Sequence, residues 1–233
     1  MGGPLHLFTT TVGKKVAMAL SGIVWVGYVV GHLIGNLQIF AGPEKINAYA
    51  EYLHHAPLLL WGTRILLATA IVVHVIASTE LALRNLAARP IGYARKRYLA
   101  TSYAARTMIW SGPILLLFIV YHLAHLTFGL TPEFGYDPHD VYSNVVRSFQ
   151  IGWLVVLYVV AQLALCAHLY HGAWSFLQTL GANHPQYDAL RQRIAAAAAA
   201  AIFVGYVSIP LAVMAGVLRP APTHAARSHD PAG

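Results

Sequence analysis

Five long apolar stretches dominate this chain and restrict what it can fold into. Each is about as long as the roughly 20 residues that a helix needs to cross the hydrocarbon core of a membrane. Inside that core every backbone polar group must find its partner within the protein, so helices are the expected element. The expected spans lie near residues 16–41, 58–83, 107–130, 151–180 and 195–218. The sequence therefore predicts an all-α membrane protein, a bundle of five transmembrane helices.

The composition leaves little of the chain for any further domain. Apolar residues make up 58% of the 233 residues, and charged residues make up 10%. We expect one domain over residues 1–218, followed by a disordered tail, 219–233, that is rich in Pro, Ala and His. Residues 44–53 are expected to form a short interfacial helix, whereas 131–150 is typical of an acidic, turn-rich loop.

Lysine and arginine are distributed unequally between the two sides of the spans, and this asymmetry sets orientation in a membrane. One side receives Lys14, Lys15, Arg191, Arg193 and the basic stretch 84–106, and the other receives Lys45, Arg147, Arg219 and Arg227. The N-terminus is therefore expected in the cytoplasm and the C-terminus outside, in a multi-pass protein of the inner (plasma) membrane. Because these basic residues lie beside spans, the formal net charge of +7 predicts contact with the lipid membrane and no nucleic-acid binding.

One histidine lies deep within each of the first four spans, where an ionisable side chain indicates a functional site. These residues are His32, His74, His122 and His168. At a rise of 1.5 Å per residue, His32 and His122 lie roughly 25 Å from the cytoplasmic starts of their spans. His74 and His168 lie about 15–18 Å from the cytoplasmic ends of theirs. The four histidines therefore form an outer pair, His32 with His122, and an inner pair, His74 with His168.

The chemistry of imidazole favours haem iron as the partner of these pairs. A neutral imidazole offers a ring-nitrogen lone pair, and histidine is a common haem ligand. With both axial positions filled by protein, the iron carries electrons and does not activate oxygen. A single histidine in a span is more often a hydrogen-bonded packing residue, but four at matching depths favour two haems.

Two neighbouring histidines leave the ligand assignment open. His125 follows His122 by three residues, and His171 follows His168 by three. Residues at this spacing share roughly the same helix face. Spacing alone therefore leaves either member of each couple as the ligand.

Gly27, Gly31 and Gly35 recur at four-residue intervals in the first span, which places them on one helix face. A smooth face of this kind allows another helix to approach closely, which is its ordinary use in membranes. A flat porphyrin edge would use the same smoothness, and the sequence supports both interpretations.

Four segments of the chain resemble one known family. They are 31–38 (GHLIGNLQ), 47–51 (NAYAE), 118–125 (FIVYHLAH) and 168–176 (HLYHGAWSF). They are similar to the cytochrome b subunit of succinate dehydrogenase/fumarate reductase, in its single-chain, five-helix, di-haem form. The most specific motif is Gly-x-Trp-Ser-Phe, which follows His171. In that family the ligand precedes this motif by four residues, which favours His168, and the corresponding position in the third span favours His122.

The resemblance implies a membrane anchor for two soluble subunits, a flavoprotein and an iron–sulfur protein. Two haem b groups would pass electrons between the iron–sulfur subunit and a quinone, and menaquinone is the usual partner of the di-haem form. The chain would act as the membrane subunit of an oxidoreductase, without oxidising succinate by itself. The soluble subunits would dock on the cytoplasmic side, beside the basic stretch 84–106.

Other side chains are weaker candidates for roles at these sites. Haem propionates need cationic or hydroxyl partners, which Arg106 and Ser21 could supply to the inner haem. Arg64 could meet a propionate or extend its charge to the membrane surface. Quinol oxidation near the outer haem would need a proton acceptor, for which we expect Glu51, with Glu44 nearby.

Three other functions compete with this one. A cytochrome b subunit of a nitrate reductase or hydrogenase would share the histidine pairs but not the Gly-x-Trp-Ser-Phe motif. A transporter with metal-binding or proton-relaying histidines would be expected to carry carboxylates within its spans, where spans two to five offer only Glu80. A haem-free structural anchor would have no use for four histidines at matching depths. The di-haem anchor accounts best for the whole pattern.

Overall fold

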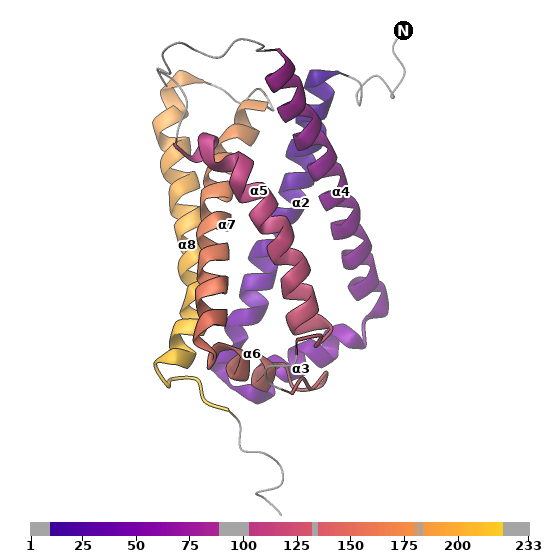
Figure 1. Ribbon diagram of the computed structural model, residues 1–233, viewed down its shortest axis with the longest axis vertical. Helices are drawn as coiled ribbons and strands as arrows, with labels where there is room; N and C mark the ends of the chain where they lie inside the picture. The colour runs from indigo at the N-terminus through magenta and orange to yellow at the C-terminus, as the bar shows by residue number, and fades with distance from the viewer. Residues whose placement is uncertain (1–9, 89–102, 132–134, 180, 182–183, 221–233) are drawn as a thin grey trace, which may run out of the picture.

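The computed structural model describes residues 10–88, 103–131, 135–179, 181 and 184–220, and every regular element among them is helical (Figure 1). Five of these helices are long and apolar enough to cross a membrane. They are α2 (Thr11–Leu37), α4 (Pro57–Ala87), α5 (Tyr103–His122), α7 (Gly152–Thr179) and α8 (Asp188–Met214). The prediction of an all-α fold is therefore confirmed for the described residues, as is that of five helices long and apolar enough to cross a membrane. Most of the basic stretch 84–106 and of the tail 219–233 lies outside the described residues.

The boundaries of two spans differ from the expected ones. Span five begins at Asp188 and not near residue 195, because Asp188 pairs with Arg191 across the first turn of α8. An acidic residue in the first turn also favours a helix start through the helix dipole. Span three ends as a π-helical turn, η2 (Leu123–Thr127), where we expected an α-helix to continue toward residue 130.

The expected loop 131–150 contains a helix, α6 (Val141–Phe149), so that prediction was wrong. Asp140 caps α6, because its carboxylate accepts a hydrogen bond of 3.0 Å from the backbone N–H of Ser143. Val146 and Phe149 are buried in the core that α6 forms with α7 and α8. By contrast, the interfacial helix expected over 44–53 is confirmed as α3 (Pro43–His54), which has a proline in its first turn.

The long helices form two antiparallel groups, one of α2 and α4 and one of α5, α7 and α8 (Figure 1). α2 packs along α4, and α7 packs along both α5 and α8, while α2 also contacts α7 and α8. At one end of the bundle α3 and α6 pack against each other and, in Figure 1, lie across the ends of the long helices. The main cluster of buried apolar residues lies at this α3/α6 end and includes Ile39, Val146 and Ile209.

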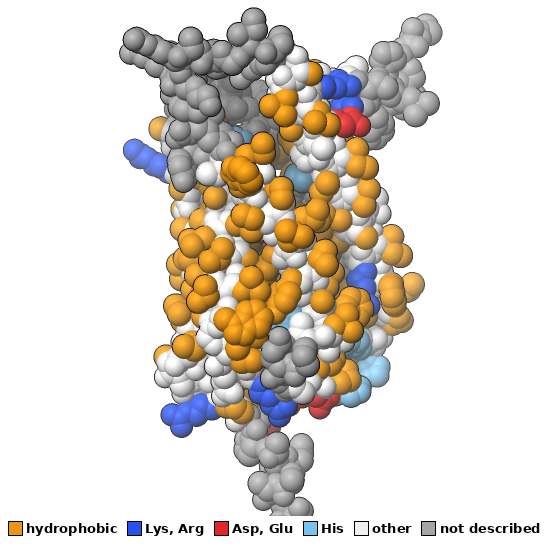
Figure 2. Space-filling model, in the orientation of Figure 1, with side chains coloured by type: hydrophobic (Ala, Val, Ile, Leu, Met, Phe, Trp, Pro, Cys, Tyr) orange, Lys and Arg blue, Asp and Glu red, His pale blue; other side chains and the backbone are white. Residues whose placement is uncertain are grey.

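Apolar side chains cover the flanks of the bundle, and most charged side chains gather toward its two ends (Figure 2). Large apolar residues such as Leu58, Ile65 and Leu117 are exposed on these flanks. At the N-terminal end, Lys14 of α2 forms an ion pair with Glu80 of α4. This distribution matches a hydrocarbon environment around the flanks and water at the ends.

Asn47 and Asp140 join α3 to α6 at the other end. The Asn47 side-chain N–H donates to the Asp140 carboxylate at 3.0 Å, and its carbonyl oxygen accepts from the backbone N–H of Tyr142 at 3.0 Å. Burial by itself raises the pKa of the Asp140 carboxyl, but hydrogen bonds from Ser143 and Asn47 outweigh it and hold the pKa below its ordinary value. The ionised carboxylate therefore stabilises this end of the fold.

Replacing Asp140 should test this junction. Asp140→Ala is expected to lower the free energy of unfolding at neutral pH by about 1 kcal/mol, the usual cost of losing a helix cap. Asp140→Asn keeps a capping oxygen and should cost less. The carboxylate stabilises the fold above its unfolded pKa of about 4 and loses this effect as the pH falls through the lower folded pKa. Unfolding in detergent, followed by circular dichroism, would contradict this account if the Asp140→Ala loss were equal at pH 7 and pH 3.

Candidate haem-binding histidine pairs

The four histidines of the spans face one another as two couples. The ring centres of His32 on α2 and His122 at the end of α5 are 5.9 Å apart, with their planes at 84°. The ring centres of His74 on α4 and His168 on α7 are 6.2 Å apart, with their planes at 54°. These are the couples that the depth argument predicted, and each joins two helices that are distant in sequence.

The two pairs lie at different depths in the bundle. Ser21 of α2 contacts His74, so the step along α2 from Ser21 to His32 measures the separation of the two levels. At 1.5 Å per residue this step is about 16 Å. The His32–His122 pair lies toward the α3/α6 end, and the His74–His168 pair lies toward the N-terminal end.

His74 is held by the backbone of α2. Its Nδ1 lies 3.0 Å from the carbonyl oxygen of Met18 and 3.3 Å from Oγ of Ser21. A carbonyl oxygen only accepts hydrogen bonds, so Nδ1 must carry the proton and Nε2 keeps its lone pair. Ser21 donates its own proton to the carbonyl of Ala17 at 2.7 Å. We expected Ser21 to meet a propionate, and the structure places it against His74.

His168 is held in the same way by a serine that the sequence argument missed. Oγ of Ser111, on α5, lies 3.3 Å from Nδ1 of His168. Ser111 is buried, and its Oγ also lies 3.9 Å from the sulfur of Met108, so the hydroxyl can donate to the sulfur and accept from the imidazole.

A repeated spacing in the sequence could have revealed Ser111. Both α2 and α5 carry the pattern Ser-Gly followed by a histidine 11 residues after the serine, from Ser21 to His32 and from Ser111 to His122. Eleven residues are about three helical turns, so the serine and the histidine share one face. Each of these helices therefore supplies one histidine to one level and a serine that supports a histidine at the other.

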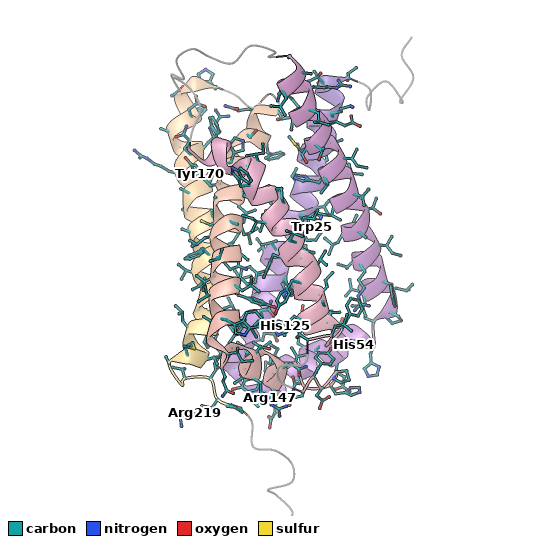
Figure 3. All side chains as sticks on the ribbon, viewed as in Figure 1. Trp25, His54, His125, Arg147, Tyr170 and Arg219 are labelled. Carbon is teal, nitrogen blue, oxygen red and sulfur yellow. The ribbon has the colours of Figure 1, made fainter. Side chains whose placement is uncertain are left out.

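His125 is fully buried and lies toward the α3/α6 end (Figure 3). Its Nδ1 lies 2.9 Å from the Tyr158 hydroxyl, and its Nε2 lies 3.2 Å from Oγ of Ser148. Both ring nitrogens are therefore engaged by protein groups, which leaves no lone pair for a metal. His122 contacts the same Tyr158 hydroxyl through Nδ1 at 3.3 Å. This geometry favours His122 over His125 as a ligand.

His168 and His171 differ in the neighbours of their rings. His168 faces His74, whereas the ring of His171 meets that of Trp174, 6.3 Å away between centres. Nδ1 of His171 is buried and has no hydrogen-bond partner among the residues that the structure describes. The structure therefore favours His168 over His171 at the pair with His74.

Aromatic rings hold His32. Tyr28 lies one turn earlier on α2 and stacks on His32, with ring centres 5.3 Å apart and an angle of 12° between the planes. Tyr206 of α8 lies 6.2 Å from His32 on a tilted plane, and its hydroxyl donates to the carbonyl of Val29 at 2.8 Å. The position of this imidazole is thus fixed from both α2 and α8.

One hollow lies beside a histidine pair, and another lies on the flank of the bundle. A pocket of about 130 Å³ adjoins His32 and His122 and is also lined by Asn36, Thr127 and Asn144. A larger, wholly apolar hollow of about 260 Å³ lies between α4 and α5, lined by Ile71, Val72, Val75, Ile76 and Leu116. At Gly27 and Gly31 of α2, the described residues place no heavy atom within 4 Å of an added Cβ, apart from the adjacent residues and the local helix backbone. Gly35 differs, because there a Cβ would meet the ring of Tyr49.

These observations fit a metal held between two imidazoles. Two rings on opposite sides of one metal ion have centres about 6 Å apart, because each metal–nitrogen bond is about 2 Å. Among the described residues, no group of three or more His, Cys, Asp or Glu is placed to hold a metal ion. Pairs of ligands suit a metal whose other ligands belong to a macrocycle, as in haem.

The structure gives the surroundings of most of the remaining candidates. Glu51 is exposed on α3, 3.7 Å from His55. Glu44 lies in the first turn of α3, and the Arg64 guanidinium stands 5.0 Å from the centre of the Trp61 ring. Arg106 lies in the first turns of α5, and its side chain is outside the described residues.

Comparison with known proteins found no matching family model, no similar curated protein and no similar solved structure.

The two neighbouring histidines should differ in their importance for stability. His125→Ala removes a buried ring and leaves Tyr158 and Ser148 without their shared partner, which should lower the free energy of unfolding by about 2–4 kcal/mol. His171→Ala is the matched control, because Nδ1 of His171 has no partner to lose. Unfolding in detergent compares the two variants, and an equal loss in both would contradict the roles assigned here.

Proposed function

We propose that this chain is the di-haem cytochrome b anchor of a succinate:quinone oxidoreductase. The observation that carries the proposal is the two imidazole pairs with ring centres 5.9 and 6.2 Å apart, together with a hydrogen-bond partner at Nδ1 of His74, His122 and His168. When bound, two b haems supply one-electron transfer between the iron–sulfur subunit and a quinone. The residues orient the ligands, and the apolar flanks of the bundle keep water from the sites.

The chain's own residues have distinct tasks in this proposal. His32 and His122 would hold one haem, and His74 and His168 the other. The Nδ1 contacts of His74 and His168 fix their tautomers and raise the basicity of Nε2, as partners of metal-bound histidine commonly do. The Gly27–Gly31 face of α2 offers room for the edge of a macrocycle, and we assign that role to it.

The resemblance in segments 31–38, 118–125 and 168–176 supports succinate dehydrogenase/fumarate reductase over other bis-histidine cytochromes. A nitrate reductase or hydrogenase subunit would share the histidine pairs, but the Gly172-x-Trp174-Ser175-Phe176 motif supports the first assignment. The flavoprotein and iron–sulfur subunits would dock at the N-terminal end, and the quinone would be menaquinone. The transporter alternative is less favoured, because Glu80, the acidic residue it would use, is paired with Lys14.

Haem content should decide between the haem-binding and haem-free functions. The purified chain is expected to bind two b haems, counted by pyridine haemochrome and a reduced-minus-oxidised spectrum. His122→Ala or His168→Ala should lose one haem, whereas His171→Ala should retain both. A wild-type chain without haem would refute the proposal. Reduction of both haems by succinate, in membranes that contain the soluble subunits, distinguishes this complex from a nitrate reductase or hydrogenase.

Orientation in the membrane can be measured separately. The N-terminal end carries Lys14, Lys15, Arg84, Arg191 and Arg193, and the α3/α6 end carries Lys45, Arg147 and Arg219. By the positive-inside rule we expect the N-terminal end in the cytoplasm of the inner membrane. Alkaline phosphatase, which is active only outside the cytoplasm, should be active when fused after residue 218 and inactive when fused within 84–106. The reverse pattern would overturn the orientation.

A further inference from the structure

We propose that Tyr158, His125 and Ser148 are positioning residues that set the tautomer and reduction potential of the site at His122. The inference rests on the proposed function, because it concerns the haem that His32 and His122 would hold. Its basis is a chain of hydrogen bonds that runs from a backbone carbonyl of α6 to Nδ1 of His122. Each step has a defined direction, so the chain fixes where every proton lies.

The directions of these hydrogen bonds follow from the backbone carbonyl oxygen of Asn144, which can only accept a hydrogen bond. The Ser148 hydroxyl donates to it at 2.6 Å, which commits the single proton of Ser148. Ser148 must then accept from Nε2 of His125, 3.2 Å away. Nε2 of His125 therefore carries a proton, and in the neutral ring Nδ1 has the lone pair.

The remaining steps follow from that tautomer. The Tyr158 hydroxyl donates to Nδ1 of His125 at 2.9 Å, which commits the tyrosine's proton. The tyrosine oxygen then accepts from Nδ1 of His122 at 3.3 Å. His122 is thereby left with its Nε2 lone pair available, the tautomer that metal ligation through Nε2 requires. The chain reaches this result with neutral groups alone.

The residues of this hydrogen-bond chain are buried, which strengthens the bonds between them. His125 and Ser148 are fully buried, and Tyr158 is 7% exposed. Hydrogen bonds in series polarise one another in a medium of low dielectric constant. The π-helical turn η2 contains His125, and such turns frequently occur at functional sites. The chain thus explains why a second histidine follows His122 without being a ligand.

The chain has a consequence for the haem's potential. A hydrogen bond accepted from Nδ1–H raises the basicity of the ligand, and a more basic ligand stabilises ferric iron. Tyr158 should therefore lower the reduction potential of the haem at His122. It should also fix the ring plane, which stands at 84° to that of His32. At the other level a single hydroxyl, that of Ser111, lies 3.3 Å from Nδ1 of His168.

The test compares Tyr158→Phe with Ser111→Ala in the purified full chain. Tyr158→Phe should retain both haems, raise the midpoint potential of one in a spectroscopic redox titration, and shift the ferric low-spin electron paramagnetic resonance signal of that haem alone. Ser111→Ala should affect the other haem. Unchanged potentials in Tyr158→Phe, or equal shifts of both haems, would overturn this inference and leave the proposed function standing. Absence of haem from the wild type would instead refute the proposed function.

A milder variant tests whether the chain acts as a unit. Ser148→Ala removes the acceptor for Nε2–H of His125 without touching Tyr158. It should raise the potential of the same haem by less than Tyr158→Phe does. Added to Tyr158→Phe it should cause no further rise, because Ser148 acts on His122 only through the tyrosine. An additive rise of the midpoint potential in the double variant would contradict the proposed series of hydrogen bonds.

Discussion

An imidazole buried at membrane depth needs a defined partner for its ring nitrogens, because water is not available to supply one. In this protein a hydrogen-bond partner lies at Nδ1 of His74, His122 and His168: a carbonyl, a tyrosine hydroxyl and a serine hydroxyl. The carbonyl at His74 only accepts, so it leaves the Nε2 lone pair of that ring free. The packing of α2 on α4 and of α5 on α7 brings these acceptors to the histidines.

The Ser-Gly pattern with its histidine 11 residues beyond the serine occurs twice, on α2 and on α5. In each case the partner helix, α4 or α7, carries the histidine that the serine supports. Two similar helix pairs thus produce two similar levels about 16 Å apart. The two levels differ at the α3/α6 end of the bundle. There His125, Ser148 and Tyr158 form a longer series of hydrogen bonds to His122.

Much of the fold follows from local patterns in the sequence. The length of the apolar runs predicted the five membrane-spanning helices, and helical rise predicted which histidines meet. The helix α6 was missed because the stretch 131–150 contains acidic and turn-forming residues, while the apolar face of α6 is only a few residues long. Its stability comes from Asp140 at its cap, from Asn47 of α3 and from burial of Val146 and Phe149, which are contacts with distant parts of the chain.

The sequence by itself determined the number of spans and the depth of each histidine, because both depend only on residue spacing along a regular helix. It also contained the serine spacing that marks Ser111. Only the tertiary structure showed that both ring nitrogens of His125 contact protein groups, and only it placed Ser21 against His74. Hydrogen-bond partners such as Tyr158 and Met18 come from other helices, and no spacing within one helix specifies them. The depth of a histidine therefore follows from its position along one helix. Which histidine is suited to bind a metal depends on the residues that other helices place around its ring.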